Sequence, residues 1–426
     1  MNKRTKTTLR RWCLYGWTLV KWTAAASAIG VVCGLIGTMF HFGVHEVTAF
    51  RGMHPWVLYL LPLAGFVIVS FYKLTETDGL GTDDIIDAVH EGKRLPILLL
   101  PAIFFGTVLT HLCGGSAGRE GAALQMGGTI GQLMGRTFRL DDRDLRVATL
   151  AGMAAFFSAL FGTPLAATVF AIMVISIGVL YHVALYPSLL AALVAYGVSV
   201  RLGVEPTRFT VAVPDQSVGM FIRVAALGVL CALVSILFCK LMHGTGYLMK
   251  RIKNPWLRVI CGGFAVIALT WIFGTDYNGA GMDIVTRAIE QETVAAPWAF
   301  LLKLIFTAVT LAAGFKGGEV VPSFFVGATF GCAAAPLLGL PVGFGAAVGL
   351  AAVFCGVTNC PVASTLLAVE LFGGEGMLYF ALACCLSYML SGYQGLYSSQ
   401  TILYSKLKAQ FINVHTNAHH AGEKTE

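Results

Sequence analysis

Residues 118–128 of the chain read GREGAALQMGG. An Arg-Glu pair between glycines leads into a mostly apolar run, which is typical of a helix that begins in an apolar environment. A helix start exposes unpaired N–H groups and the positive end of the helix dipole, and glycine leaves those groups open to a small anion. We therefore predict an anion site, which the carboxylate of Glu120 occupies until it is protonated. The alternative is a Glu120 that only complements the dipole.

The composition indicates a membrane protein. Of 426 residues, 57% are hydrophobic and 12% are charged, with a mean hydropathy of +0.76. Soluble domains carry roughly a quarter charged residues. Long apolar runs, able to cross the bilayer with their flanking residues, cover residues 56–72, 95–112, 224–239 and 259–273. We predict an all-α, multi-pass integral membrane protein that contacts the lipid bilayer and no nucleic acid.

The N-terminal segment, residues 1–22, combines basic and aromatic side chains. By the positive-inside rule this end is expected in the cytoplasm, with its aromatic rings at the membrane interface. A signal peptide is disfavoured because no A-x-A-like cleavage site closes a short apolar core. Lys and Arg residues that flank membrane segments account for the formal net charge of +7.

An internal repeat is the strongest feature of the chain. Three motifs recur in the same order at an offset close to 200 positions. The pairs are 79–85 with 279–284, 127–131 with 327–331, and 152–167 with 349–364. Repeats with helices broken by Gly and Pro at matching places are typical of secondary transporters, which bind substrate between their halves near the bilayer midplane.

The repeat predicts how the chain is divided. We expect a first membrane repeat over 23–205, a second over 206–410 and a short polar tail over 411–426, with the boundary inside the polar stretch 201–216. The tail, which contains His415, His419 and His420, is expected to be disordered and not to bind metal.

Three further stretches read as helix starts near the anion site. They are GLGTD at 79–83, GGEVVP at 317–322 before a helix from Ser323, and GLYS at 395–398. Glu319 is either a plain first-turn residue or a second intramembrane carboxylate that carries protons. The hydroxyl of Tyr397 either donates to the anion or sits at the membrane interface.

Other polar residues are expected to be structural. Arg119 is more readily explained as an ion-pair anchor than as a ligand of the ion. His111 and Glu370 lie in apolar stretches and are expected to have their hydrogen bonds satisfied locally. The eleven cysteines follow no metal-binding spacing and are expected to pack as small apolar side chains. We predict no metal and no cofactor.

Taken in order, these segments resemble the CLC family of chloride channels and anion/proton antiporters. The resemblance spans about residues 22–407. GREG at 118–121 is similar to the family's G-[KR]-E-G-P signature, with Ala122 in place of proline. GLGTD at 79–83 is similar to G-S-G-I-P, and GEVVP at 318–322 stands where the family has G-x-F-x-P. Tyr397 matches the family's pore tyrosine.

The departures from the family pattern resemble its fluoride/proton antiporter branch. After FGTPL at 161–165, Met173 and Val174 stand where chloride/proton antiporters have an inner proton-transfer glutamate. Leu80 replaces the serine that favours chloride, and Glu319 matches a glutamate of the fluoride branch. The resemblance implies an inverted-repeat bundle of tilted and broken helices. It also implies a homodimer in the plasma or inner membrane of the cell, with cytoplasmic termini.

The expected function is proton-coupled fluoride export that protects the cell. A chloride/proton antiporter or chloride channel of the same fold is the alternative. Glu120 is expected to be the protonatable gate and Glu319 to couple proton and fluoride passage. The expected anion-binding residues are Gly79, Leu80, Gly81, Arg119, Gly121, Val320, Val321 and Tyr397. We do not predict an enzyme, because the apolar segments contain no visible nucleophile–base or metal constellation.

Overall fold

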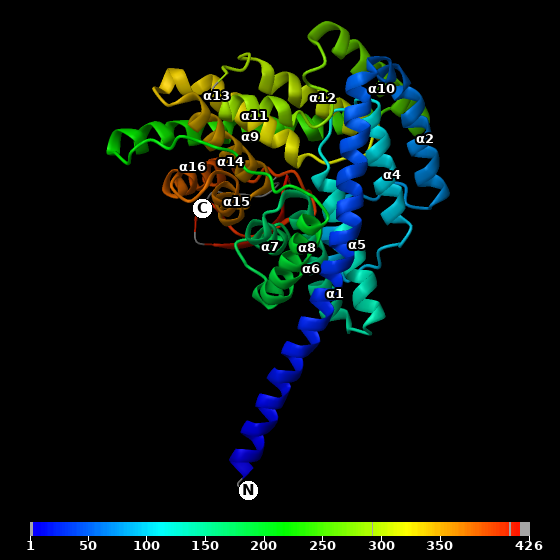
Figure 1. Cartoon of the computed structure of the whole chain (residues 1–426), viewed down its shortest axis with the longest axis vertical. Helices are drawn as coiled ribbons and strands as arrows, with labels where there is room; N and C mark the ends of the chain where they lie inside the picture. Colours follow the sequence, from blue (N-terminus) through cyan, green and yellow to red (C-terminus); the bar gives the residue numbers. More distant parts are fainter. Residues whose placement is uncertain (1–2, 292, 409, 418–426) are drawn as a thin grey trace.

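The computed structural model describes residues 3–291, 293–408 and 410–417, which form sixteen α-helices and three short strands (Figure 1). The first eight helices and two 3₁₀ turns are α1 (Lys3–Met53), η1 (Pro55–Leu60), α2 (Leu61–Leu74), α3 (Thr82–Glu91), α4 (Leu99–Leu112), α5 (Glu120–Thr137), α6 (Asp142–Phe161), α7 (Pro164–Met173), η2 (His182–Ala184) and α8 (Leu185–Arg201). The other eight are α9 (Val218–Met249), α10 (Pro255–Phe273), α11 (Met282–Glu290), α12 (Ala299–Ala313), α13 (Val320–Leu338), α14 (Val342–Thr358), α15 (Pro361–Phe372) and α16 (Met377–Leu390).

The predicted all-α membrane fold is confirmed. Among the described residues, seven helical segments are long and apolar enough to cross a bilayer, and shorter apolar helices such as α4, α7 and α15 lie between them. Helices of that shorter kind start or stop at membrane depth, where the free backbone groups at their ends need partners or a cavity. A bundle of this kind can therefore place helix ends inside the membrane.

A backbone bridge joins the two halves of the repeat. The N–H of Gly118 donates to the carbonyl of Gly318 at 2.7 Å, and the N–H of Gly318 donates to the carbonyl of Gly118 at 2.8 Å. The two residues are 200 positions apart, which is the offset of the repeat. When a residue pairs antiparallel with its own counterpart, the local two-fold axis passes between the two residues. The starts of α5 and α13 are therefore brought together by the symmetry of the repeat.

Glycines at matching positions allow close helix packing in both halves. A Cβ on Gly152 of α6 would overlap the carbonyl oxygen of Gly127 of α5. In the same way, a Cβ on Gly349 of α14 would overlap the carbonyl oxygen of Gly327 of α13. Small residues let membrane helices approach this closely. The two tight pairs, α5–α6 and α13–α14, hold the helix starts of the two halves in place.

Residues 3–22 of the predicted N-terminal segment and the first part of the predicted first repeat belong to one helix. No break separates residues 22 and 23, because α1 runs without interruption from Lys3 to Met53. Its first turns extend away from the rest of the bundle (Figure 1), and residues 11–20 are exposed. Farther along, Lys21 forms an ion pair with Asp144 at the start of α6. The helix therefore begins outside the body and joins it near Trp22, which is buried.

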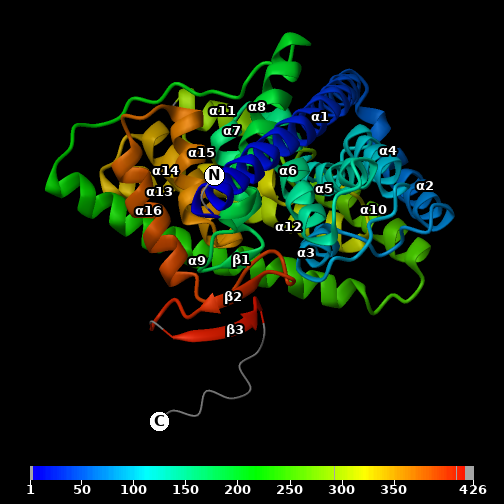
Figure 2. The same ribbon diagram turned by 90° about the horizontal axis from the view of Figure 1, so that it is seen from below.

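The C-terminal region is not disordered as far as Asn417, so that prediction was wrong there. The strands β1 (Ser176–Ile177), β2 (Thr401–Tyr404) and β3 (Phe411–His415) form one small sheet, with β2 between the other two (Figure 2). Thr416 Oγ1 donates to the carbonyl of Tyr397 at 2.5 Å. These contacts give the segment fixed partners. His419 and His420 lie outside the described residues.

Two predicted helix starts also need correction. α13 begins at Val320, three residues before the predicted start at Ser323. GLYS at 395–398 starts no helix within the described chain; it lies in the loop between α16 and β2. The N–H of Leu396 donates to the carbonyl of Val357 at 2.9 Å. That long-range bond holds the loop extended across the end of α14.

Candidate anion site

The site is built where α5 and α13 begin. Arg119 is the N-cap of α5 and Glu319 is the N-cap of α13, with similar backbone angles (φ −109°, ψ −6° and φ −94°, ψ −13°). A Cβ on Gly121 would lie 2.8 Å from Cα of Gly318, so only glycines fit at this junction. Two helix N-termini, each with a positive dipole end and free N–H groups, therefore meet at one place inside the protein.

Glu120 is fully buried at this junction. Its Oε2 accepts a hydrogen bond from the backbone N–H of Arg119 at 2.8 Å, and the N–H groups of Glu120 and Val321 also face the carboxylate. Its Oε1 has no hydrogen-bond partner among the described residues. The carboxylate thus accepts from N–H groups of both helix starts, but one of its two oxygens has no hydrogen bond among the described residues. It stands where a small anion would bind.

Arg119 contacts Glu120 and also faces a vestibule. Its Nε lies 3.6 Å from Oε1 of Glu120, and its Nη1 lies 3.1 Å from Nδ1 of His41 on α1. Arginine has no lone pair to offer, so Nδ1 of His41 must be the acceptor. The side chain therefore serves as the ion-pair anchor expected from the sequence, held from the other side by His41.

Glu319 and Tyr397 lie on the same junction. One Glu319 oxygen is 3.4 Å from the position of a Cβ built on Gly121. The Tyr397 hydroxyl is buried, has no hydrogen-bond partner in the part of the chain that the structure describes, and interacts electrostatically with Glu319, Asp83 and Glu120. Asp83 of α3 accepts from the N–H of Ser399 at 3.1 Å, which ties the Tyr397 loop to α3.

The start of α3 differs from the expectation. The Gly81 N–H was expected to be free for the anion, but it donates to Oδ2 of Asp84 at 2.8 Å. The N–H of Leu80 donates to the carbonyl of Thr77 at 3.2 Å. Asp84 is the third residue of the helix, from which a carboxylate commonly reaches back to the N-cap. This helix start already holds a negative charge of its own.

The first turn of α13 differs in what it offers. Val320 and Val321 are both buried, and their apolar side chains leave the backbone as the only donor. The N–H of Val321 faces the Glu120 carboxylate. Of the expected anion-binding set, the structure thus gathers Arg119, Gly121 and the two valines around Glu120. The N–H groups of Leu80 and Gly81 instead bond to Thr77 and Asp84 of their own segment.

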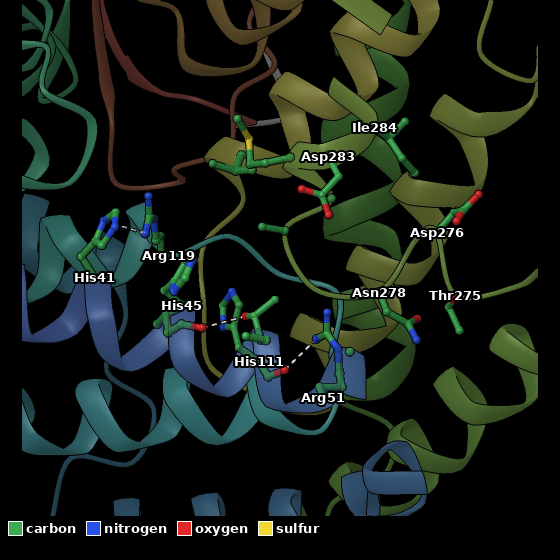
Figure 3. Close-up of a pocket in the computed structure, with 18 of the residues that line it drawn as sticks. His41, His45, Arg51, His111, Arg119, Thr275, Asp276, Asn278, Asp283 and Ile284 are labelled. Carbon is green, nitrogen blue, oxygen red and sulfur yellow. Dashed lines mark hydrogen bonds between the residues drawn. The ribbon is translucent and has the colours of Figure 1, made fainter. Parts of the chain in front are cut away.

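A vestibule of about 770 Å³ leads to Glu120 and Arg119 (Figure 3). It is lined by the end of α1, by His111 of α4 and by the start of α11 with the loop before it. Arg51 donates to the carbonyl of His111 at 2.6 Å. This vestibule is not apparent from the sequence, because its lining comes from segments that no motif connects.

The two residues expected to be structural have different environments. Glu370 accepts from the N–H groups of Leu165 and Ala166 at 3.1 and 2.8 Å, so it caps α7 as a satisfied group. His111 is satisfied only at Nδ1, which lies 2.9 Å from the carbonyl of Thr107. Its Nε2 is buried and has no partner within the described residues.

The chain is similar to known proteins over most of its length. Residues 63–392 match the family described as voltage gated chloride channel. A chloride/fluoride channel protein of Pseudomonas syringae pv. tomato is 38% identical over 400 residues, covering 91% of this chain and 88% of that protein. The crystal structure of a CLC-type fluoride/proton antiporter matches with a TM-score of 0.88 at 32% identity, covering 91% of this chain and 99% of the other.

A structure with lower sequence identity has a similar fold. A slow cyanobacterial Cl⁻/H⁺ antiporter matches with a TM-score of 0.75 at 19% identity, over 87% of this chain and 94% of that one. The match to the family covers well over half of the chain, and it includes the bridged glycines and both helix starts of the site. The protein is therefore a member of the voltage-gated chloride channel (CLC) family.

Proposed function

We propose that this protein exports fluoride in exchange for protons. The observation that carries the proposal is the buried Glu120 carboxylate, which accepts from the Arg119 N–H at 2.8 Å where two helix starts meet. A protonated Glu120 loses its charge and leaves these donors, and a fluoride ion takes its place. Proton binding and fluoride binding thus depend on the same residue. Exchange follows when the two alternate.

The choice of fluoride is supported by three positions. Leu80 offers no hydroxyl where the family's chloride-selective members have serine, and Val174 stands in place of an inner glutamate. Glu319 supplies a carboxylate at the same junction, so it assists proton or fluoride passage where the inner glutamate is missing. A 32% identical structure of a fluoride/proton antiporter and a 38% identical chloride/fluoride channel protein support the same ion.

The experiment is fluoride efflux from proteoliposomes, recorded with a fluoride electrode and a pH electrode together. The unaltered protein is expected to release fluoride and take up protons in a fixed ratio. Glu120→Gln keeps the size of the side chain but cannot be protonated or deprotonated, so it is expected to lose the coupled proton movement. Fluoride efflux without proton uptake in the unaltered protein would contradict the proposal.

Chloride is the second candidate ion. The name of the Pseudomonas relative includes chloride, and the fold is shared with a Cl⁻/H⁺ antiporter. Chloride at a large excess over fluoride is expected to leave the fluoride rate unchanged. Full inhibition by chloride, or chloride flux equal to fluoride flux, would favour the chloride antiporter or channel.

We also propose a homodimer in the inner or plasma membrane with both termini in the cytoplasm. The basic residues before Trp22 support this orientation by the positive-inside rule. In this orientation the far end of α1, with His41 and Arg51, faces the outside, and the vestibule opens there. Protons therefore reach Glu120 through the vestibule, and fluoride leaves by it.

A further inference from the structure

Among the described residues that line the vestibule, His111 is the one histidine with a buried ring nitrogen that lacks a hydrogen-bond partner. The side chain is 1% exposed, it lines the vestibule, and its Nε2 has no hydrogen-bond partner. Its Nδ1 lies 2.9 Å from the carbonyl of Thr107, which can only accept. Nδ1 must therefore carry a hydrogen. In the neutral ring, Nε2 then carries a lone pair that no protein donor meets.

The charges around His111 decide what this lone pair can take. Arg51 of α1, Arg119 at the start of α5 and Lys303 of α12 all interact electrostatically with the ring. In the view of Figure 3 the ring is drawn between Arg51 and Arg119. The other titratable groups that line the vestibule are Glu120, His41, His45, Asp276, Asp283 and Arg287. Glu120 lies 3.6 Å from Nε of Arg119 and offsets part of its charge. Asp283 interacts with Arg51 and offsets part of its charge.

The neighbouring cations Arg51 and Arg119 repel a proton that arrives alone, because an imidazolium would add a further positive charge. A proton that arrives with an anion adds no net charge, and the same cations then attract the anion. Fluoride is the anion of a weak acid and shares its proton with a base such as imidazole. Chloride is the anion of a strong acid and brings no proton.

We propose that His111 Nε2, with Arg51 and Arg119, forms a second fluoride site in the vestibule, which binds one fluoride together with one proton. Fluoride and a proton from solution become an imidazolium N–H donating to fluoride, and no other group changes. Binding of undissociated hydrogen fluoride gives the same complex. The inference rests on the proposed function for its ion, but the site can be tested without transport.

The test measures proton uptake on fluoride binding to the full chain in detergent micelles. It uses titration calorimetry in two buffers that differ in ionisation enthalpy. The background is Glu120→Gln, which removes the proton that the gate itself would take. Adding His111→Gln is expected to remove about one proton per bound fluoride, as linkage requires of a lost titrating site. Equal proton uptake with and without His111 would overturn the proposal.

His54→Gln is the matched control. His54 makes the same bond from Nδ1 to the carbonyl four residues earlier, at 3.0 Å, but does not line the vestibule. Its replacement is expected to leave proton uptake unchanged. Chloride in place of fluoride is expected to cause none of the His111-dependent uptake; the same uptake with chloride would contradict the site's chemistry.

A second measurement leaves residue 111 intact. In protein with ¹⁵N-labelled histidine, NMR is expected to show one ring change from the singly to the doubly protonated form with fluoride. No such ring with fluoride would refute the site even if His111→Gln failed to fold. If this proton uptake occurs in a protein that moves no fluoride, the proposed function fails and the site stands. If fluoride and protons are exchanged but the uptake does not depend on His111, the site alone fails.

Discussion

Asp84 is expected to compete with the transported anion for the start of α3. Its Oδ2 lies 2.8 Å from the N–H of Gly81, which is the donor that a fluoride ion would need at this end. An anion must therefore displace a carboxylate of the same charge. Asp84→Ala removes the competitor and leaves the backbone in place. We expect this variant to bind fluoride more tightly while the protein becomes less stable.

The expected size follows from the bond that the anion no longer has to break. A hydrogen bond to a charged group contributes about 1.5–3 kcal/mol net, which corresponds to roughly a 10- to 150-fold gain in fluoride affinity. Loss of a capping side chain costs about 1 kcal/mol in the free energy of unfolding. Fluoride binding is thus expected to strengthen while the protein becomes less stable. A general loosening of the fold would weaken both, so it cannot account for this combination.

Asp87→Ala is the control for charge. Asp87 is on the same helix and its carboxylate lies 3.7 Å from Nζ of Lys93, away from the Gly81 N–H. Asp87→Ala removes the same charge as Asp84→Ala but is expected to change fluoride affinity much less than Asp84→Ala does. Affinity is measured by calorimetry in micelles and stability by thermal unfolding. Unchanged or weaker fluoride binding in Asp84→Ala would refute the competition.

Further predictions concern the junction and its supports. Gly318→Ala places a Cβ against the backbone of Gly121; it is expected to cost about 1–3 kcal/mol through overpacking and to abolish transport. Gly244→Ala, with open space around its Cβ, is expected to do neither, and thermal unfolding with flux assays checks both. Tyr397→Phe breaks no hydrogen bond within the described residues, so stability should hold while fluoride affinity, measured by calorimetry, falls roughly threefold to tenfold with the loss of a donor. Lys303→Met frees two carbonyls of the loop before α11 that Nζ binds at 3.1 and 2.6 Å; it is expected to lower the unfolding temperature and speed proteolysis of that loop.

Local sequence rules predicted the parts of the site that depend on local geometry. The start of α5 was predicted because glycine and a first-turn acid act within one helical turn, whereas the start of α13 was predicted three residues too late. The loop at Tyr397 was misassigned because its conformation depends on a bond from Leu396 to Val357. β3 was missed because a five-residue strand needs a partner, and β2 is brought to it only by the folded chain.

The role of His111 shows the same limit. An apolar stretch predicts that its ring is buried, and it is. Which nitrogen is satisfied depends on the carbonyl of Thr107 one turn earlier, and this could be anticipated from the helix alone. What faces the other nitrogen depends on how α1, α4 and α11 enclose the vestibule. No pattern within one segment reports on such a cavity.

The asymmetry of the repeat explains how one junction can serve two sides. With an offset of 200, Glu319 takes the place of Arg119, and Val320 takes the place of Glu120. The two N-caps share their backbone angles, so the side chains at equivalent positions leave the two helices in equivalent directions. Arg119 faces the vestibule and His41. Across the two-fold axis, Glu319 then faces the opposite side, where it interacts with Asp83.

We expect a carboxylate on each side of one bridge to give protons two separate binding positions. Glu120 lies on the vestibule side and Glu319 on the other, and both border Gly121 or its neighbours in the bridge. If the repeat were strictly symmetric, position 320 would also be a glutamate. Two like charges would then lie face to face at positions 120 and 320, which is costly in a buried site. Moving the second by one residue separates the charges by about 100° around its helix. The symmetric backbone supplies the donors, and the displaced glutamate keeps the two carboxylates apart.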